Sequence, residues 1–229
     1  MNATQTKTLN LHGVGKGSYT APEVARLLKT SSLNVNRWLR GYSHQQGETT
    51  KRSLPLWRTQ HPEIEEHLEI GFRDLIELRF VKAFLDAGVG LLAIRNCLEY
   101  ARECVGDERP FSTQRFQTDG RTIFLEGIQK SGESNLLDLK KRQYVFKQII
   151  EQTFKDLDIE NKAVVRWRPF NGKKSIVIDP ERSFGQPIAS DFGVPTVVLA
   201  DAAKVEEFGG RCCQTLRNSG RGRSGCSFI

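Results

Sequence analysis

The sequence predicts an α+β protein that is mainly α-helical and carries short β-hairpins. Two short helical segments fall within residues 19–42, on either side of a turn. Apolar residues then recur at helical spacing over residues 71–105 and again over residues 135–158. The favoured turn dipeptides Asp119-Gly120 and Asn171-Gly172 lie between short apolar runs and predict hairpins. With 229 residues, the chain is long enough for more than one small domain with its own core.

Composition excludes several classes of protein. Hydrophobic residues make up 38% and charged residues 27%, which differs from disordered, collagenous and membrane sequences. No apolar run approaches the roughly 18 to 20 residues that a membrane span needs, and residues 1–7 lack the apolar segment of a signal peptide. The five cysteines are odd in number and form no CxxC pair, so no disulfide framework or zinc site is indicated. We expect a cytoplasmic protein.

The positive charge is concentrated near the two ends. The net charge is +7, but residues 1–60 alone carry nine Lys/Arg against two Glu, and residues 211–229 carry four Arg and no acid. The remaining body is therefore mildly acidic. A localised basic region is typical of nucleic-acid binding, although a solvated basic surface explains charge alone equally well.

Residues 1–18 are polar and Gly-rich, and we expect a flexible arm there. The glycines around Lys16 suggest a phosphate-binding loop. That loop needs a glycine where Asn10 stands and a Ser or Thr where Gly17 stands. No nucleotide or other cofactor is therefore expected.

The first short helix has a clear start signal. Thr20 followed by Glu23 is a capping box, and Pro22 stands in the first turn, where its missing N–H group costs nothing. A turn at residues 29–31 leads into a second helix that Gly41 ends. Two such helices across a short turn predict a helix-turn-helix.

The second helix exposes groups suited to DNA. Val35, Trp38 and Leu39 form its apolar face, and amide and guanidinium side chains occupy much of the rest. These groups can donate to base edges and phosphates. The alternative is an ordinary helical hairpin packed in a core. The expected DNA-binding residues of this motif are Thr20, Ser32, Asn34, Asn36, Arg37 and Arg40.

The next segment predicts a wing. Residues 43–53 read as a polar loop with Lys51 and Arg52 near its tip, residues 54–57 as a short apolar strand, and residues 68–70 as a second strand beside it. A basic loop next to a recognition helix can contact the DNA backbone, so Lys51 and Arg52 complete the expected DNA-binding set.

These motifs together resemble a known family. Residues 19–42 are similar to the helix-turn-helix that opens MerR-type regulators, with Trp38 at the end of the recognition helix. The two apolar-striped helices of residues 71–105, broken at Gly88 and Gly90, are similar to the pair that follows their wing. The resemblance implies a winged helix-turn-helix DNA-binding domain over residues 19–105.

The middle of the chain predicts a hairpin and a connecting helix. Residues 116–124 read as a hairpin around Asp119-Gly120, and residues 135–158 as a long helix that could dimerise. This region spans residues 106–160. After it, residues 163–167 and 175–178 predict a second hairpin, and Pro195 begins a helix near Thr196.

The segment of residues 178–187, Ile-Asp-Pro-Glu-Arg-Ser-Phe-Gly-Gln-Pro, resembles the small antitoxin domain found next to PIN-like toxins. With the N-terminal half, residues 19–208 resemble a VapB-type antitoxin with a MerR-like head. The resemblance implies an operator-binding autorepressor, a homodimer and a PIN-like ribonuclease toxin as partner of residues 161–208. Because such toxins hold Mg²⁺ in a carboxylate cluster, arginines could fill their cleft.

The partner-binding residues expected from this resemblance are aromatic and arginine side chains of the C-terminal third, because interfaces concentrate binding energy in these types. For each arginine the alternative is an ordinary surface position, and for the Trp and the second Phe it is a small core. The expected set is Arg166, Trp167, Arg168, Phe170, Arg182 and Phe184.

Residues 209–229 depart from the family pattern. They have no apolar period and hold three of the five cysteines. This basic tail resembles sequence translated out of frame more than a domain, and we expect it to add little to folding.

Two other classes of function compete with an antitoxin. A stand-alone MerR-like regulator that responds to a small ligand would need a sensor, yet no metal-binding cysteines follow the long helix. An enzyme would need a catalytic constellation. None of the four histidines has metal-ligand spacing, and no nucleophile elbow or paired-carboxylate motif is present, so neither catalysis nor a metal site is predicted.

Overall fold

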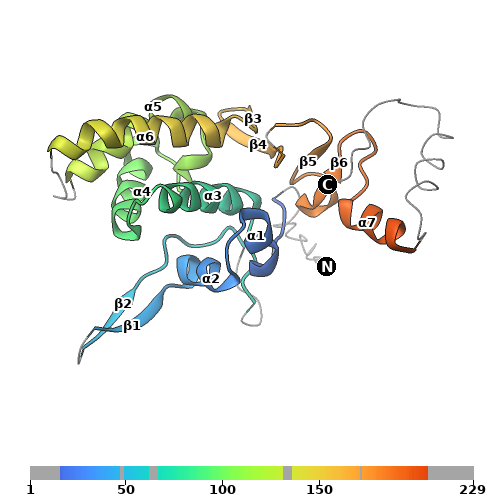
Figure 1. Cartoon of the computed structure of the whole chain (residues 1–229), viewed down its shortest axis with the longest axis horizontal. Coiled ribbons are helices and arrows are strands. Elements are labelled where there is room, and N and C mark those ends of the chain that lie inside the picture. Colours follow the sequence, from blue (N-terminus) through green and yellow to red (C-terminus); the bar gives the residue numbers. More distant parts are fainter. Residues whose placement is uncertain (1–15, 47–48, 62–66, 131–135, 171, 206–229) are drawn as a thin grey trace, which may run out of the picture.

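The computed structural model describes residues 16–46, 49–61, 67–130, 136–170 and 172–205. These residues form seven α-helices and two small antiparallel sheets, which confirms the predicted α+β class. In Figure 1 a central helix, α3 (Phe72–Asp86), lies between the two N-terminal helices and a longer helix pair. The expected arm and basic tail lie outside the described residues.

The two helices predicted within residues 19–42 form, with a turn between them. Helix α1 (Ala21–Leu28) starts at the capping box of Thr20 and Glu23, and helix α2 (Ser32–Arg40) starts where the Ser31 hydroxyl accepts a hydrogen bond from a backbone N–H. Gly41 ends α2. The apolar faces of both helices join the hydrophobic core, in which Val35 is completely buried.

The wing is a hairpin, but its strands differ from the predicted ones. Strands β1 (Tyr42–Gln46) and β2 (Thr49–Ser53) pair antiparallel, so the expected polar loop is itself the sheet. Residues 54–57 form no strand, and residues 68–70 contribute only a bridge between Tyr19 and Ile70. The apolar run of residues 54–57 instead places Leu56 and Trp57 in the core. A hairpin whose strands lie mostly in solvent has no apolar alternation to reveal it.

The predicted helix pair of residues 71–105 is confirmed as α3 and α4 (Leu91–Val105). Most residues of helix α3 are buried, and its Phe80 and Phe84 rings pack against five further phenylalanine rings. The ring centroids of Phe80 and Phe154 are 5.0 Å apart, and those of Phe84 and Phe124 are 4.3 Å apart. The rings of this core belong to Phe80, Phe84, Phe111, Phe116, Phe124, Phe146 and Phe154.

The predicted hairpin around Asp119-Gly120 is wrong. After a short 3-10 turn at Pro110–Ser112, residues Gln114–Lys130 form helix α5, which packs on α6 (Leu136–Phe154). Gly120 serves close packing rather than a turn. A Cβ there would lie 3.1 Å from the Phe116 ring and 3.2 Å from Ile150 Cδ1. The long helix is confirmed but ends at Phe154, short of the expected residue 158.

The C-terminal sheet has four antiparallel strands in the order β3-β4-β5-β6. The predicted hairpin forms as β4 (Ala163–Trp167) and β5 (Ile176–Ile178). Strands β3 (Leu157–Glu160) and β6 (Pro187–Ala189) were not predicted, and β3 begins within the segment expected to be the long helix. Helix α7 (Thr196–Val205) begins beside Pro195 as expected. Among the described residues, no helix is long and apolar enough to cross a membrane.

Candidate nucleic-acid interface and C-terminal surface

Helix α2 presents its polar side to solvent. Arg37 and Arg40 are exposed, and Ser32 and Asn36 are partly exposed beside them. The Asn36 amide donates to the Ser32 carbonyl oxygen at 2.8 Å, which restrains the orientation of the amide. The Asn34 amide donates to the Thr30 hydroxyl at 3.1 Å and so stabilises the turn between the helices.

Helix α2 and the β1–β2 hairpin meet through a cation–π contact. The Arg37 guanidinium carbon lies 5.4 Å from the centroid of the Tyr42 ring, at the start of β1. Lys51 and Arg52 are exposed on the paired strand β2. The contact restricts the long Arg37 side chain. Cationic groups are thus exposed on both α2 and the hairpin, an arrangement that can bind a polyanion.

Thr20 is occupied by helix capping. Its hydroxyl donates to Glu23 at 2.8 Å and accepts from the Glu23 backbone N–H at 3.4 Å. The side chain is exposed. Its described contacts are therefore those that start α1.

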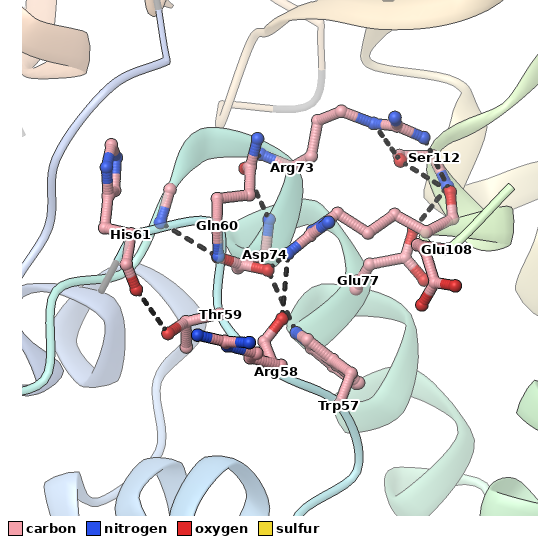
Figure 2. A network of polar contacts seen from close by, with 12 residues as sticks. Trp57, Arg58, Thr59, Gln60, His61, Arg73, Asp74, Glu77, Glu108 and Ser112 are labelled. Atoms are coloured by element: carbon pink, nitrogen blue, oxygen red, sulfur yellow. Dashed lines mark hydrogen bonds and ion pairs between the residues drawn. The ribbon is translucent and has the colours of Figure 1, made fainter. Parts of the chain in front are cut away.

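A buried polar network attaches the segment after the wing to α3 (Figure 2). Asp74 is completely buried and accepts from the Trp57 indole at 3.0 Å and from the Gln60 backbone at 2.7 Å. It also accepts from the Gly71 N–H at 3.1 Å and pairs with the Arg109 guanidinium at 2.7 Å. One carboxylate thus joins three separate segments of chain.

Glu77, one turn along α3, performs a similar role. Its two oxygens accept from the backbone N–H groups of Phe111 and Ser112 at 3.2 and 2.8 Å. Burial raises the pKa of Glu77 from 4.5 to about 7, although these hydrogen bonds oppose the shift. Sequence reasoning missed this network. Its signal was two carboxylates, Asp74 and Glu77, spaced by one turn within an apolar helix.

In the C-terminal sheet, three members of the expected partner-binding set have internal contacts. Trp167 is 4% exposed, donates to Asp156 at 3.1 Å and lies under the Arg79 guanidinium, 4.9 Å from its ring centroid. Arg166 pairs with Glu160 at 2.9 Å and with Asp179 at 3.1 Å. The Arg168 guanidinium pairs with Asp158 at 2.7 Å.

The other three expected residues are exposed. Phe184 is 78% exposed and Phe170 50%, and Arg182 is exposed with no ion pair among the described residues. Ser183 and Phe184 have φ values of 47° and 55°, which are unusual for residues other than glycine. The loop therefore holds a large apolar side chain in solvent with a strained backbone.

Further apolar side chains near this loop were not predicted. Phe192, Val197 and Val198 are 48%, 54% and 53% exposed, on the β6–α7 connection and the first turn of α7. For Val197 and Val198 the signal was the run Pro195-Thr-Val-Val-Leu, which has more apolar residues than one buried face requires.

The described residues offer little for a small ligand or a metal ion. A surface pocket of about 250 Å³ lies between α5 and α6 and is lined mainly by polar side chains. Within the described ranges, no group of three or more His, Cys, Asp or Glu side chains is placed to hold a metal ion. The pocket is lined by Gln117, Thr118, Arg121, Thr122, Lys147, Ile150 and Glu151.

Comparison with known proteins finds a relative in sequence and a solved structure of similar fold. No protein-family model matches the chain. A protein of Mycobacterium tuberculosis (strain ATCC 25618 / H37Rv), "Putative antitoxin VapB45", is 30% identical over 193 residues, covering 77% of this chain and 78% of that protein. The crystal structure of Rv2018 from Mycobacterium tuberculosis has a TM-score of 0.63 and 23% identity, covering 86% of this chain and 91% of that one. This second likeness shows a shared fold.

Proposed function

The chain belongs to the family of VapB-type antitoxins, and we propose that it binds operator DNA as an autorepressor and neutralises a PIN-like ribonuclease toxin. In this proposal the two activities occupy different parts of the chain. The winged helix-turn-helix, which we propose to be MerR-like, binds DNA. The C-terminal sheet and α7 bind the toxin.

The observation that carries the DNA-binding proposal is the exposed cationic side of α2 beside a basic wing. Arg37 and Arg40 are exposed on α2, and Lys51 and Arg52 are exposed on β2. In our proposal Ser32, Asn36, Arg37 and Arg40 approach base edges, while Lys51 and Arg52 contact phosphates. Asn34 and Thr20 act mainly by holding the turn and the start of α1 in place.

The toxin-binding proposal rests on the exposed loop of η2 (Ser183–Gly185) and its surroundings. Phe184 supplies an apolar anchor, Phe170 adds a second ring, and Arg182 supplies a cation for the carboxylate cluster of the toxin. In this proposal Arg166, Trp167 and Arg168 have a structural part, since their polar groups are engaged by Glu160, Asp156 and Asp158.

We propose a homodimer as the active form, because winged helix-turn-helix proteins commonly read two half-sites. The antitoxin role is favoured over a regulator that senses a small ligand. The described pocket between α5 and α6 is small and lined mainly by polar side chains, whereas ligand sites are usually larger and apolar.

One experiment tests both halves of the proposal. The full chain is co-expressed with the PIN-like reading frame adjacent to its gene, and the purified complex is assayed for ribonuclease activity and for binding to the upstream DNA. We expect a stable complex with suppressed ribonuclease activity that binds this DNA. A chain that neither retains the ribonuclease nor suppresses its activity would refute toxin neutralisation. If neither the complex nor the free chain binds the upstream DNA, autorepression is refuted.

A further inference from the structure

Leu33 is an exposed apolar residue on an otherwise polar helix surface. It is the second residue of α2, and its side chain is 58% exposed. The buried residues of α2 are Val35, Trp38 and Leu39. At 3.6 residues per turn, Leu33 lies nearly opposite the centre of that buried face.

Its neighbours on the exposed side are guanidinium groups. Arg37 and Arg40 are four and seven residues after Leu33, so the three side chains follow one another along the same side of α2. A protein partner that covered Leu33 would have to bury these two charges as well. DNA instead neutralises guanidinium groups with its phosphates and accepts their hydrogen bonds at guanines. Its thymine methyl groups can contact an apolar side chain beside them.

Leu33 also stands at the end of the helix that reads bases. In helix-turn-helix proteins the N-terminal residues of the recognition helix contact base edges in the major groove. The Ser31 hydroxyl and the Asn34 amide, on either side of Leu33, are engaged in the cap and in the turn. Leu33 therefore offers an exposed apolar side chain at this end of α2.

We propose that Leu33 contacts the C5 methyl group of one thymine in the major groove and so specifies that base pair. This inference rests on the proposed operator binding. The thymine methyl is the apolar feature that distinguishes this base in the major groove. Since Arg37 lies about 6 Å further along the helix, any guanine that Arg37 reads is expected within about two base pairs of this thymine.

The test uses the full chain and a duplex that the chain selects from a random library. Each thymine of the selected site is replaced in turn by deoxyuridine, which removes only the methyl group. At one position we expect about fourfold weaker binding, equivalent to the loss of one buried methyl. Leu33→Ala should bind the original duplex correspondingly less tightly and should show no further loss at that position.

Two control variants make the result specific. Leu33→Met keeps an apolar side chain of similar length and should retain the sensitivity to deoxyuridine. Leu92→Ala removes a leucine that is 63% exposed on α4, away from the recognition helix, and should behave as the unmodified chain.

The outcomes separate this inference from the function on which it rests. If the chain selects a site but tolerates deoxyuridine at every thymine, or if Leu33→Ala keeps the full deoxyuridine effect, the assignment of Leu33 is overturned and operator binding stands. If the chain selects no sequence and shows no salt-dependent binding, operator binding fails and the assignment of Leu33 fails with it.

Discussion

The Tyr19 hydroxyl donates a hydrogen bond of 2.7 Å to the carbonyl oxygen of Gly185, a residue 166 positions further along the chain. Tyr19 directly precedes the helix-turn-helix and is 3% exposed, and burial raises the pKa of its phenol. The adjacent backbone is joined as well, since the Ser18 N–H donates to the Phe184 carbonyl oxygen at 3.0 Å. The proposed DNA-binding and toxin-binding parts are thus in direct contact.

Replacing Tyr19 with phenylalanine should destabilise the fold. The change removes the donor and leaves the Gly185 carbonyl unsatisfied, which costs about 1–3 kcal/mol. Chemical denaturation measures this loss. The matched control is Tyr144→Phe, because Tyr144 is 65% exposed and its hydroxyl contacts only Gln148 on the same helix among the described residues. Equal stability of the two variants would show that the Tyr19 contact contributes nothing.

The Asp74 network should be essential for stability. In Asp74→Asn the charge that faces Arg109 is lost and an amide N–H₂ group meets other donors, so we expect a loss of about 3–5 kcal/mol. Asp86→Asn serves as the control, since Asp86 forms an exposed ion pair with Lys82 and should change stability by less than about 1 kcal/mol. The free energy of unfolding of both variants is compared with that of the unmodified chain, and similar losses would contradict the prediction.

Glu77 should make stability depend on pH in a definite direction. Burial raises its pKa from 4.5 to about 7 in the folded state, so between these values the folded chain holds a proton that the unfolded chain releases. The contribution of Glu77 to stability is complete below about pH 4.5 and is lost as the pH rises through about 7. In Glu77→Gln this part of the slope should disappear. Denaturation midpoints across this range measure it, and parallel pH profiles would refute the shift.

The DNA-binding proposal predicts two distinct phenotypes. Arg37→Ala should weaken operator binding by about 1–3 kcal/mol and relax specificity, if Arg37 reads a base. Lys51→Ala should weaken binding to all sequences about equally. It should also reduce the slope of log affinity against log salt concentration by about one. Titrations of operator and shuffled duplexes at several salt concentrations separate these effects. An equal loss on both duplexes for Arg37→Ala would assign Arg37 to the phosphates.

The toxin-binding proposal predicts that Phe184 is an anchor. Since Phe184 is 78% exposed, Phe184→Ala should leave thermal stability nearly unchanged while it weakens toxin binding by about 2 kcal/mol or more. The control is Leu54→Ala, which removes another large apolar side chain, 62% exposed, and should leave the affinity for the toxin unchanged. Calorimetric titration with the PIN-like ribonuclease measures both, and unchanged affinity of Phe184→Ala would exclude this loop from the interface.

Local signals predicted the elements whose ends depend on neighbouring residues. The capping box of Thr20 and Glu23 starts α1, Gly41 ends α2 and Pro195 precedes α7. Each signal acts through backbone groups within a few residues, so the sequence alone is sufficient to place it. The exposed side of α2 followed from the same local periodicity.

Tertiary structure decided the features that depend on distant contacts. Gly120 is a turn residue by local preference but lies within α5, because close packing against Ile150 of α6 excludes a larger side chain. Trp167 is an anchor by residue type but is buried, because Arg79 and Asp156 enclose it.

The same division holds for charged groups. Sequence reasoning identified Arg166, Arg168 and Arg182 as equivalent cations, yet only the fold pairs the first two with carboxylates of neighbouring strands. It likewise could not assign Asp74 its partners on segments far along the chain. The sequence by itself determined which helices form and which side of α2 faces outward, since those depend on neighbouring residues. Only the tertiary structure decided which charges and rings remain available to a partner, because burial and ion pairing depend on residues brought together by folding.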